Sequence, residues 1–265
     1  MENLIVIPAR YMSSRFPGKP LVELSGSTGK CKPLIERTWR LAKKVKGENR
    51  IIVATDSRKI KSVAEKFGAE VLLTSSECVN GTERVAEVLD KLNREYSVII
   101  NLQGDAPLTP VWFIDTLVKA MENIEDDIAT PVIRCDLEAY NNFLEDRKKG
   151  LVGGTTVVFD TFMKALYFSK EVLPYVSDIK IYKAVSPVFH HVGIYAYRSS
   201  ALRSYRELGP SILERREGLE QLRFLENGIP IKCIEVRAEG VEFWELNNPG
   251  DVERIESIMK RQNMV

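Results

Sequence analysis

The sequence predicts an α/β fold built on a doubly wound, mostly parallel sheet. The chain has 265 residues, of which 44% are hydrophobic, so it can bury a sizeable core. Its first apolar segments are short, continuous and rich in β-branched residues, as in strands covered on both faces. Segments with helical spacing separate them, and this alternation is typical of βαβ units.

The first half of the chain alternates strands and helices in order. Residues 4–9 and 51–55 form β-branched runs, and residues 33–45 between them carry apolar side chains at helical spacing. Asp56 or Ser57 can cap the next helix, which Gly68 ends. We then expect a strand, a helix and a further strand, at residues 70–74, 82–93 and 97–102.

The second half is less regular. We expect strands at residues 128–134, 155–159, 191–197, 231–236 and 241–246, and helices at residues 212–226 and 249–259. No linker rich in Pro, Gly or Ser marks a boundary. Residues 1–265 are therefore expected to form a single domain, with a β-rich part around residues 150–230.

Composition excludes several classes of protein. The 38 Lys and Arg residues against 37 Asp and Glu residues leave a net charge of +1, which disfavours a nucleic-acid partner. No apolar run approaches the roughly 18 residues of a membrane helix, so we expect a soluble, cytoplasmic protein without a membrane partner. Neither a disulfide framework nor a zinc site is indicated by the widely separated Cys31, Cys78, Cys135 and Cys233.

The loop after the first strand, residues 8–20, concentrates positive charge. Arg10, Arg15 and Lys19 accompany two hydroxyls and a glycine. Guanidinium groups, an ammonium and loop amides together suit a polyphosphate. The loop matches neither a Walker A motif nor a dinucleotide-binding G-x-G-x-x-G, so P-loop ATPases and nicotinamide oxidoreductases lose support. The alternative is a solvated basic turn.

A second loop, residues 101–107, follows the expected strand at residues 97–102 and contains Asp105. Ligands of open parallel sheets bind beyond the carboxyl ends of the strands, so Asp105 should share one edge with the cationic loop. A carboxylate among phosphate-binding cations can hold Mg²⁺ against phosphate oxygens. The alternative is that Asp105 only caps a helix or forms a turn.

Seven motifs follow one another along most of the chain: IPARYMSSRFPGKPL, ATD, GTERVAE, QGD, ALYFS, HVGIYAYR and LEQLR. In this order they resemble the 3-deoxy-manno-octulosonate (Kdo) cytidylyltransferases, the CMP-Kdo synthetases of lipopolysaccharide biosynthesis. The resemblance implies the nucleotide-diphospho-sugar transferase fold, which is glycosyltransferase-A-like, and a homodimer with a sugar-binding and dimerisation part around residues 150–230. It also implies that CTP and an acidic sugar, a 3-deoxy-2-ulosonic acid, react with Mg²⁺ to give a CMP-sugar and pyrophosphate.

The resemblance also implies roles for individual residues. The triphosphate is assigned to Arg10, Ser13, Arg15 and Lys19, and the surroundings of the cytidine to Ala9, Thr82, Arg84 and Gln103. The sugar pocket is assigned to Tyr167, Lys170, His191, Tyr195, Glu220 and Gln221, and the metal to Asp105 and Asn247. Arg10, Lys19 and Asp105 are the expected catalytic residues.

Two assignments on the sugar side have structural alternatives. His191 is a candidate base near neutral pH, and since neighbours on a strand face opposite sides, only one of His190 and His191 can point into the site. His191 can equally be a structural histidine bonded to the backbone. Glu220 and Gln221 can equally form a solvated helix face.

Three departures from the family pattern affect the metal or the sugar. Asn247 stands where the family has an aspartate, and residues 151–156 lack the family's lysine. Lys170 replaces an arginine, which changes a bidentate clamp into a point charge. The acceptor is therefore expected to be Kdo or a variant such as an amino-Kdo, a nonulosonate or a phosphonate. The alternatives are a nucleotide-binding relative with weakened catalysis and a generic phosphate-binding module.

Overall fold

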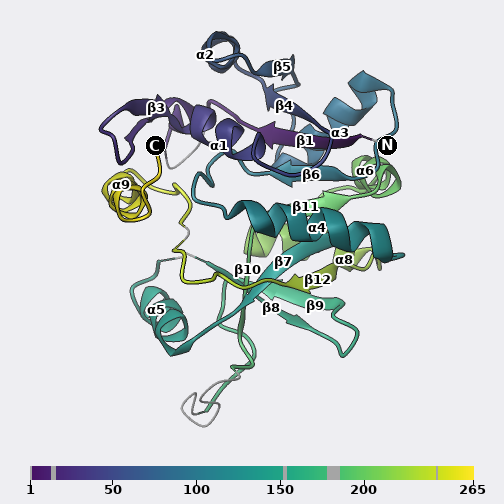
Figure 1. Cartoon of the computed structure of the whole chain (residues 1–265). Helices are drawn as coiled ribbons and strands as arrows, with labels where there is room; N and C mark the ends of the chain where they lie inside the picture. Colours follow the sequence, from purple (N-terminus) through teal and green to yellow (C-terminus); the bar gives the residue numbers. More distant parts are fainter. Residues whose placement is uncertain (1, 13–15, 152–153, 178–185, 243) are drawn as a thin grey trace.

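One mixed sheet of ten strands forms the centre of the computed structural model, which describes residues 2–12, 16–151, 154–177, 186–242 and 244–265 (Figure 1). The elements, in chain order, are β1 (Asn3–Pro8), the 3-10 turn η1 (Lys19–Leu21), β2 (Glu23–Ser25), β3 (Cys31–Pro33), α1 (Leu34–Ala42), β4 (Asn49–Thr55), α2 (Arg58–Lys66), β5 (Glu70–Leu73), α3 (Gly81–Leu92), β6 (Ile99–Leu102), α4 (Val111–Asn123), β7 (Ile128–Arg134), α5 (Leu137–Lys148), β8 (Thr155–Phe159), β9 (Ala165–Ser169), β10 (Phe189–His191), β11 (Ile194–Tyr197), α6 (Ser199–Glu207), α7 (Ile212–Glu217), α8 (Leu222–Glu226), β12 (Lys232–Glu235) and α9 (Asp251–Arg261). The strand order is β5-β4-β1-β6-β11-β7-β10-β8-β9, and β12 pairs with β7.

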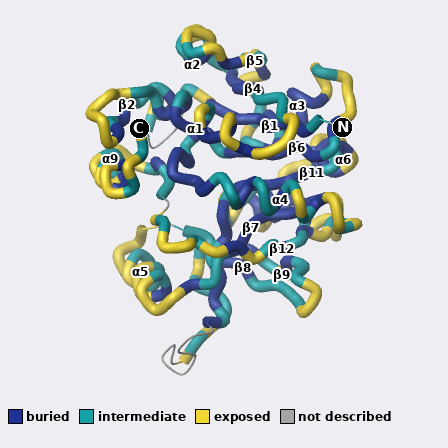
Figure 2. The backbone as a smooth tube through the Cα atoms, in the orientation of Figure 1, coloured by how far each residue is buried: buried dark blue, intermediate teal, exposed yellow. Residues whose placement is uncertain are grey.

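The N-terminal half of the sheet has the predicted parallel arrangement. β1 lies between β4 and β6, parallel to both, and β5 extends the sheet beyond β4. Ser57 caps α2, as expected from the sequence. The strand residues of β1 are all buried because helices cover both faces of the sheet, and the burial continues through the central strands in Figure 2. The α/β fold is thus confirmed.

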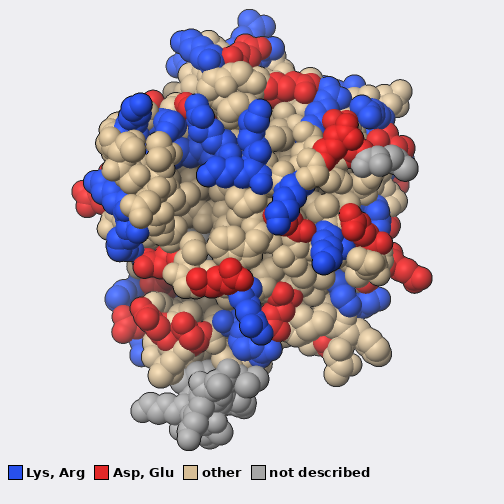
Figure 3. Space-filling view, in the orientation of Figure 1, with Lys and Arg blue, Asp and Glu red and all other residues tan. Residues whose placement is uncertain are grey.

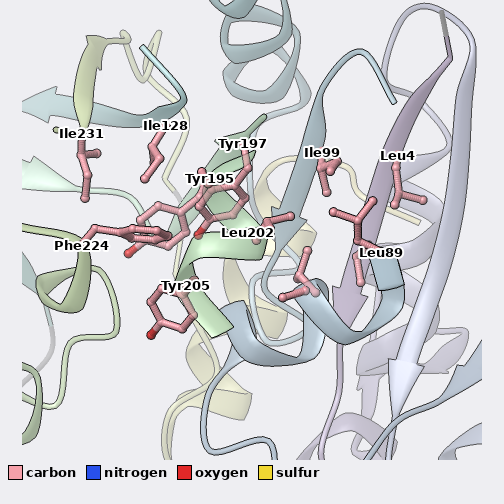
Figure 4. Close-up of a cluster of buried hydrophobic side chains, with 14 of the residues drawn as sticks. Leu4, Leu89, Ile99, Ile128, Tyr195, Tyr197, Leu202, Tyr205, Phe224 and Ile231 are labelled. Atoms are coloured by element: carbon pink, nitrogen blue, oxygen red, sulfur yellow. The ribbon is translucent and has the colours of Figure 1, made fainter. Parts of the chain in front are cut away.

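Side chains of β1 alternate between two cores. Leu4 and Val6 pack with residues of α3, α6 and α8 on one face, where Tyr195, Tyr197, Tyr205 and Phe224 form an aromatic group (Figure 4). Ile5 and Ile7 pack with residues of α1, α2 and α4 on the other. This period of two within a continuous apolar run is what a strand buried on both faces requires.

The C-terminal half of the sheet is antiparallel, so the sheet as a whole is mixed and not mostly parallel. β11 pairs antiparallel with both β6 and β7, and β10 pairs antiparallel with β7 and β8. Only the short segment 160–164 joins β8 to β9, too few residues for the crossover helix that parallel neighbours need. β12 returns to parallel pairing with β7.

Three expected elements differ in the structure. The strand expected at residues 191–197 is two strands, β10 and β11, separated at Val192 and Gly193. The helix expected at residues 212–226 breaks at Gly218, whose φ of +64° ends α7, so Glu220 and Gln221 lie in the connection to α8. The strand expected at residues 241–246 is absent among its described residues, because the N–H of Leu246 donates to Asp105 and not to a neighbouring strand.

The C-terminal helix α9 returns to the first half of the molecule, beside the hairpin of β2 and β3 (Figure 1). Ile255, Ile258 and Met259 pack there on Leu24 and Leu34. The segment before α9 therefore runs along the loop after β6. Within the described ranges, no helix is long and apolar enough to cross a membrane. The four cysteines are free thiols, as expected.

Candidate active site

A cleft of about 1460 Å³ lies beyond the carboxyl ends of β1 and β6. Seen from one side, Figure 3 shows a hollow with Lys and Arg gathered toward α1 and Asp and Glu gathered toward α5. The first half of the chain lines the cleft with Ala9, Arg10, Lys19, Arg84, Gln103 and Asp105. The second half lines it with His190, His191, Tyr195, Glu220, Gln221, Trp244 and Asn247. Eleven of the predicted nucleotide, sugar and metal residues thus lie around one cavity.

The cationic loop is held at both of its ends. The N–H of Ala9 donates to Ala54 at 2.8 Å, and the N–H of Gly18 donates to Tyr11 at 2.9 Å. Gly18 has a φ of +73°, a conformation that favours glycine, and leads into the turn that carries Lys19. Lys19 thus faces the cleft from a fixed turn. The predicted residues Ser13 and Arg15 lie outside the described residues.

Gly104 brings the second loop against the first. A Cβ at Gly104 would lie 2.7 Å from the carbonyl oxygen of Pro8, so a larger residue would push the loop after β6 away from the end of β1. The hydroxyl of Thr38 donates to the carbonyl of Gly104 at 3.1 Å and fixes the loop from α1. As a result, the Lys19 ammonium forms a salt bridge with the Asp105 carboxylate.

Asp105 and Asn247, the two residues predicted to hold Mg²⁺, both line the cleft. Their segments are tied together because the N–H of Leu246 donates to the carbonyl of Asp105 at 2.9 Å. Asp105 contributes a carboxylate and Asn247 a neutral amide oxygen, both of them hard ligands of the kind that Mg²⁺ takes together with substrate phosphates. The described residues contain no group of three or more His, Cys, Asp or Glu placed to hold a metal, so phosphate oxygens would complete the coordination.

The Asp251 carboxylate is engaged by the turn that precedes α9. It accepts hydrogen bonds from Trp244 Nε1 at 3.1 Å and from the N–H groups of Asn247 and Asn248 at 2.9 and 2.6 Å. Asp251 begins α9, where a carboxylate also favours the helix dipole. Its role is therefore to shape the turn that presents Asn247.

The N-terminus of α3 forms a further wall of the cleft. Asn80 caps this helix by accepting from the N–H of Glu83 at 2.9 Å. A Cβ at Gly81 would lie 2.8 Å from Gln103 Nε2, so a larger residue there would displace the end of the Gln103 side chain. Thr82 is buried, with its hydroxyl 3.0 Å from the Tyr197 hydroxyl.

Glu220 connects this wall to the sugar side. Its carboxylate accepts from the N–H of Thr82 at 3.0 Å and from Gln103 Nε2 at 3.2 Å. Burial raises the pKa of Glu220, although its hydrogen bonds from Thr82 act in the opposite direction. Gln221 is buried, and its Nε2 has no partner among the described residues, so this donor can serve a ligand. The solvated-face alternative for Glu220 and Gln221 is not what the structure shows.

Residues that follow β4 and β5 hold the side chain of Arg84. Its guanidinium pairs with Asp56 after β4 at 3.3 Å and donates to Thr74 and to the carbonyl of Ser75 after β5. Only 3% of the side chain is exposed. These contacts fix the direction of Arg84 at the edge of the cleft.

His191 is neutral and hydrogen-bonded to a threonine. Its Nε2 lies 3.0 Å from the hydroxyl of Thr130, which itself lies 2.8 Å from the carbonyl of Ile194. Since the hydroxyl donates to that carbonyl, its oxygen accepts from His191. Burial, followed by the proximity of His190, lowers the pKa of His191 to about 3. The partner of His191 is thus the Thr130 side chain and not the backbone, which the structural alternative expected.

This environment predicts a pH dependence of stability. In the unfolded chain His191 has an ordinary pKa near 6.5, so it binds a proton below that pH while the folded protein does not. The free energy of unfolding should therefore decrease as the pH falls from 6.5 toward 4, by up to about 1.4 kcal/mol per pH unit from this group.

Urea unfolding at pH 7 and pH 5, with imidazole NMR of the folded protein, measures this effect. A His191 imidazole that titrates near pH 6.5 in the folded state would contradict it.

Two predicted sugar residues, Tyr167 and Lys170, do not line the cleft. The Tyr167 hydroxyl and the Lys170 N–H both donate to Glu217 of α7, at 3.3 and 3.0 Å. The Ser169 hydroxyl donates to the same carboxylate at 2.8 Å. β9 thus holds α7, and through it the connection that carries Glu220.

Sequence reasoning missed several cleft residues, Asn80 and Trp244 among them. Asn80 precedes Gly-Thr-Glu, and an Asn three residues before a Glu is a recognisable helix start that could have indicated it. Trp244 stacks on the guanidinium of Arg254, which lies 3.5 Å from its ring centre. No local signal identifies Trp244, which packs against a cluster of Leu24, Leu34 and residues of α9 that only the fold brings together.

The cleft is consistent with the family of proteins that this chain resembles in sequence. A model of the family described as "Cytidylyltransferase" matches residues 4–234. The chain belongs to the cytidylyltransferase family. It is 40% identical over 260 residues to the 3-deoxy-manno-octulosonate cytidylyltransferase of Maricaulis maris, covering 98% of this chain and 97% of the relative. It is 41% identical over 261 residues to the mitochondrial enzyme of that name from Arabidopsis thaliana, covering 98% and 83%.

Solved structures support the same family. A CMP:2-keto-3-deoxy-manno-octonic acid synthetase complexed with CTP superposes with a TM-score of 0.83 at 33% identity, covering 99% of this chain and 100% of the other. The inositol-1-phosphate CTP transferase of T. maritima has a TM-score of 0.60 at 13% identity, covering 98% and 95%. The second likeness concerns the fold alone.

Proposed function

We propose that this cytidylyltransferase transfers CMP from CTP to the anomeric hydroxyl of Kdo and releases pyrophosphate. The observation that carries the proposal is the convergence of Lys19, Asp105 and the N-terminus of α3 in one cleft. Relatives that are about 40% identical over nearly their whole length carry the name of this activity. The chemistry at the α-phosphorus needs in-line alignment of the two substrates and neutralisation of charge more than covalent catalysis.

On the nucleotide side, each group has a task that follows from its chemistry. Arg10 and Lys19 offer the triphosphate a guanidinium fork and an ammonium, with Ser13 and Arg15 as further predicted contacts. Ala9, Thr82, Arg84 and Gln103 are proposed to surround the cytidine. Asp56 supports this wall indirectly, since it fixes the guanidinium of Arg84.

The proposed metal residues are Asp105 and Asn247. Bound Mg²⁺ supplies charge stabilisation at the phosphate oxygens. Asp105 provides the negative charge on the protein side, and Asn247 provides a neutral oxygen from a turn shaped by Asp251. Because the second ligand is neutral, much of the attraction for the metal falls to Asp105 and the triphosphate.

On the acceptor side, we propose that His191, Tyr195, Glu220 and Gln221 form the wall that meets the sugar. The lowered pKa of His191 keeps its imidazole uncharged, so it acts by shape and hydrogen bonding and not as the base. Tyr167 and Lys170 act through Glu217, which holds the segment carrying Glu220. The variant-acceptor hypothesis depended on Lys170 meeting the sugar carboxylate. Since Lys170 does not line the cleft, we favour Kdo itself.

A homodimer and a cytoplasmic location remain part of the proposal. The edge strand β9 carries Leu166, which is 63% exposed, within the part predicted to form the dimer contact. An exposed apolar residue on the last strand of a sheet favours association. Light scattering of the purified protein measures the oligomeric state directly.

Pyrophosphate release measured with a panel of nucleotides and acceptors tests the function. We expect release with CTP, Mg²⁺ and Kdo, and much less with ATP, GTP or UTP in place of CTP. Amino-Kdo, a nonulosonate and a phosphonate serve as competing acceptors. Release with none of these acids, although CTP binds, would contradict the proposal and favour a nucleotide-binding relative with weakened catalysis.

A further inference from the structure

In the structure, the positive charge that faces the Asp105 carboxylate is the ammonium group of Lys19. Lys19 Nζ pairs with Asp105 Oδ2, and the two side chains are only 15% and 25% exposed. Both partners are held in place: Lys19 by the turn after Gly18, and Asp105 by the close contact of Gly104 with Pro8. The pair therefore belongs to the site and is not a chance contact of mobile surface side chains.

This ion pair couples two binding events. Asp105 is the carboxylate proposed to hold Mg²⁺, and Lys19 is the ammonium proposed to hold the triphosphate. An ammonium beside a metal-bound carboxylate repels the metal unless negative charge lies between them. A triphosphate supplies that charge and gives Lys19 a second anionic partner.

We infer that the Lys19 ammonium pairs with the Asp105 carboxylate until CTP binds. In the nucleotide-free protein this pair weakens metal binding, whereas the same ammonium strengthens nucleotide binding. The inference rests on the proposed function and adds the order of events: Mg²⁺ alone binds poorly, and the nucleotide releases Asp105 by engaging Lys19. Linkage makes this coupling reciprocal, so metal and nucleotide each raise the affinity for the other. A lysine that only contacted phosphate would have no effect on metal binding in the absence of nucleotide.

The test measures metal binding and nucleotide binding separately. Free Mn²⁺, followed by its electron paramagnetic resonance signal, is titrated with wild type, Lys19→Met and Lys19→Arg in the absence of nucleotide. Lys19→Met should bind Mn²⁺ about five-fold or more tightly than wild type, the lower end of typical coupling between two sites. Lys19→Arg should stay weak because it keeps the positive charge.

CTP binding without metal, measured by calorimetry in EDTA, should change in the opposite direction. Lys19→Met removes a charged hydrogen bond and should weaken CTP binding by about ten-fold or more. The matched control is Lys61→Met, which breaks a surface pair with Glu65 at 3.4 Å and should alter neither affinity.

Unchanged or weaker Mn²⁺ binding by Lys19→Met would overturn the inference, as would equal tightening in Lys19→Arg. Circular dichroism of each variant establishes that it is folded, and Lys19→Gln replaces Lys19→Met if that variant is not. If wild type transfers CMP to Kdo but Lys19→Met leaves Mn²⁺ affinity unchanged, only the inference fails. If Mn²⁺ binding tightens but no acid accepts CMP, the proposed function fails.

Discussion

Asp105→Asn should lower kcat by about 10²–10³-fold, the range seen when one preorganised electrostatic contact at a reacting centre is lost. The substitution keeps the size of the side chain and removes its negative charge. Since Asn247 is already neutral, the variant would retain no charged ligand among the proposed metal residues. The Lys19 ammonium would also lose its partner. Steady-state pyrophosphate release at several Mg²⁺ concentrations measures the effect.

Asp115→Asn is a suitable control for this experiment. Asp115 lies on α4, outside the cleft, and accepts from the N–H of Lys46 at 2.9 Å. The control should leave kcat unchanged. If Asp105→Asn turned over CTP at the wild-type rate, or did so in EDTA, the assignment of Asp105 to the metal would be wrong.

Arg223→Met should reduce the free energy of unfolding by about 3–5 kcal/mol, as is typical when one partner of a buried ion pair is removed. Arg223 is 2% exposed and pairs with Glu214 at 2.7 Å and with Glu83 at 2.9 Å. Its guanidinium also lies 4.2 Å from the centre of the Tyr205 ring. Methionine fills similar space but leaves two partly buried carboxylates without their cation.

Arg203→Met provides the comparison on the surface. Arg203 pairs with Glu95, and both side chains are more than half exposed, at 55% and 58%. Its loss should destabilise the protein much less than the loss of Arg223, because water and salt screen exposed pairs. Urea denaturation of both variants measures the difference, and equal losses would mean that the Arg223 cluster is no more stabilising than an exposed pair.

The sequence predicted the first half of the fold better than the second. Continuous β-branched runs separated by helical spacing identify β1, β4 and β6, because burial on both faces leaves no polar alternation. The second half depends on pairings between distant strands, such as β11 with β6, that local pattern does not encode. The strand expected at residues 241–246 shows the same limit, since an apolar segment can pack without joining a sheet.

The candidate site was also predicted only in part. Lys19 and Asp105 could be predicted from their positions after buried strands, since strand ends meet at one edge of a sheet. The hydrogen-bond partners of the other site residues could not be predicted in this way. The contact of Glu220 with Thr82 and Gln103 requires the break at Gly218, and the neutral state of His191 requires its burial beside Thr130.

The central claim is transfer of the α-phosphorus of CTP to Kdo, and following a radiolabel tests it most directly. CTP labelled at the α-phosphorus and CTP labelled at the γ-phosphorus are incubated separately with the protein, Mg²⁺ and Kdo, and the products are separated. The α-label should appear in a sugar nucleotide that forms only when Kdo is present, and the γ-label should appear only in pyrophosphate. Transfer of the γ-label to the sugar, or no transfer of the α-label that depends on Kdo, would contradict the account.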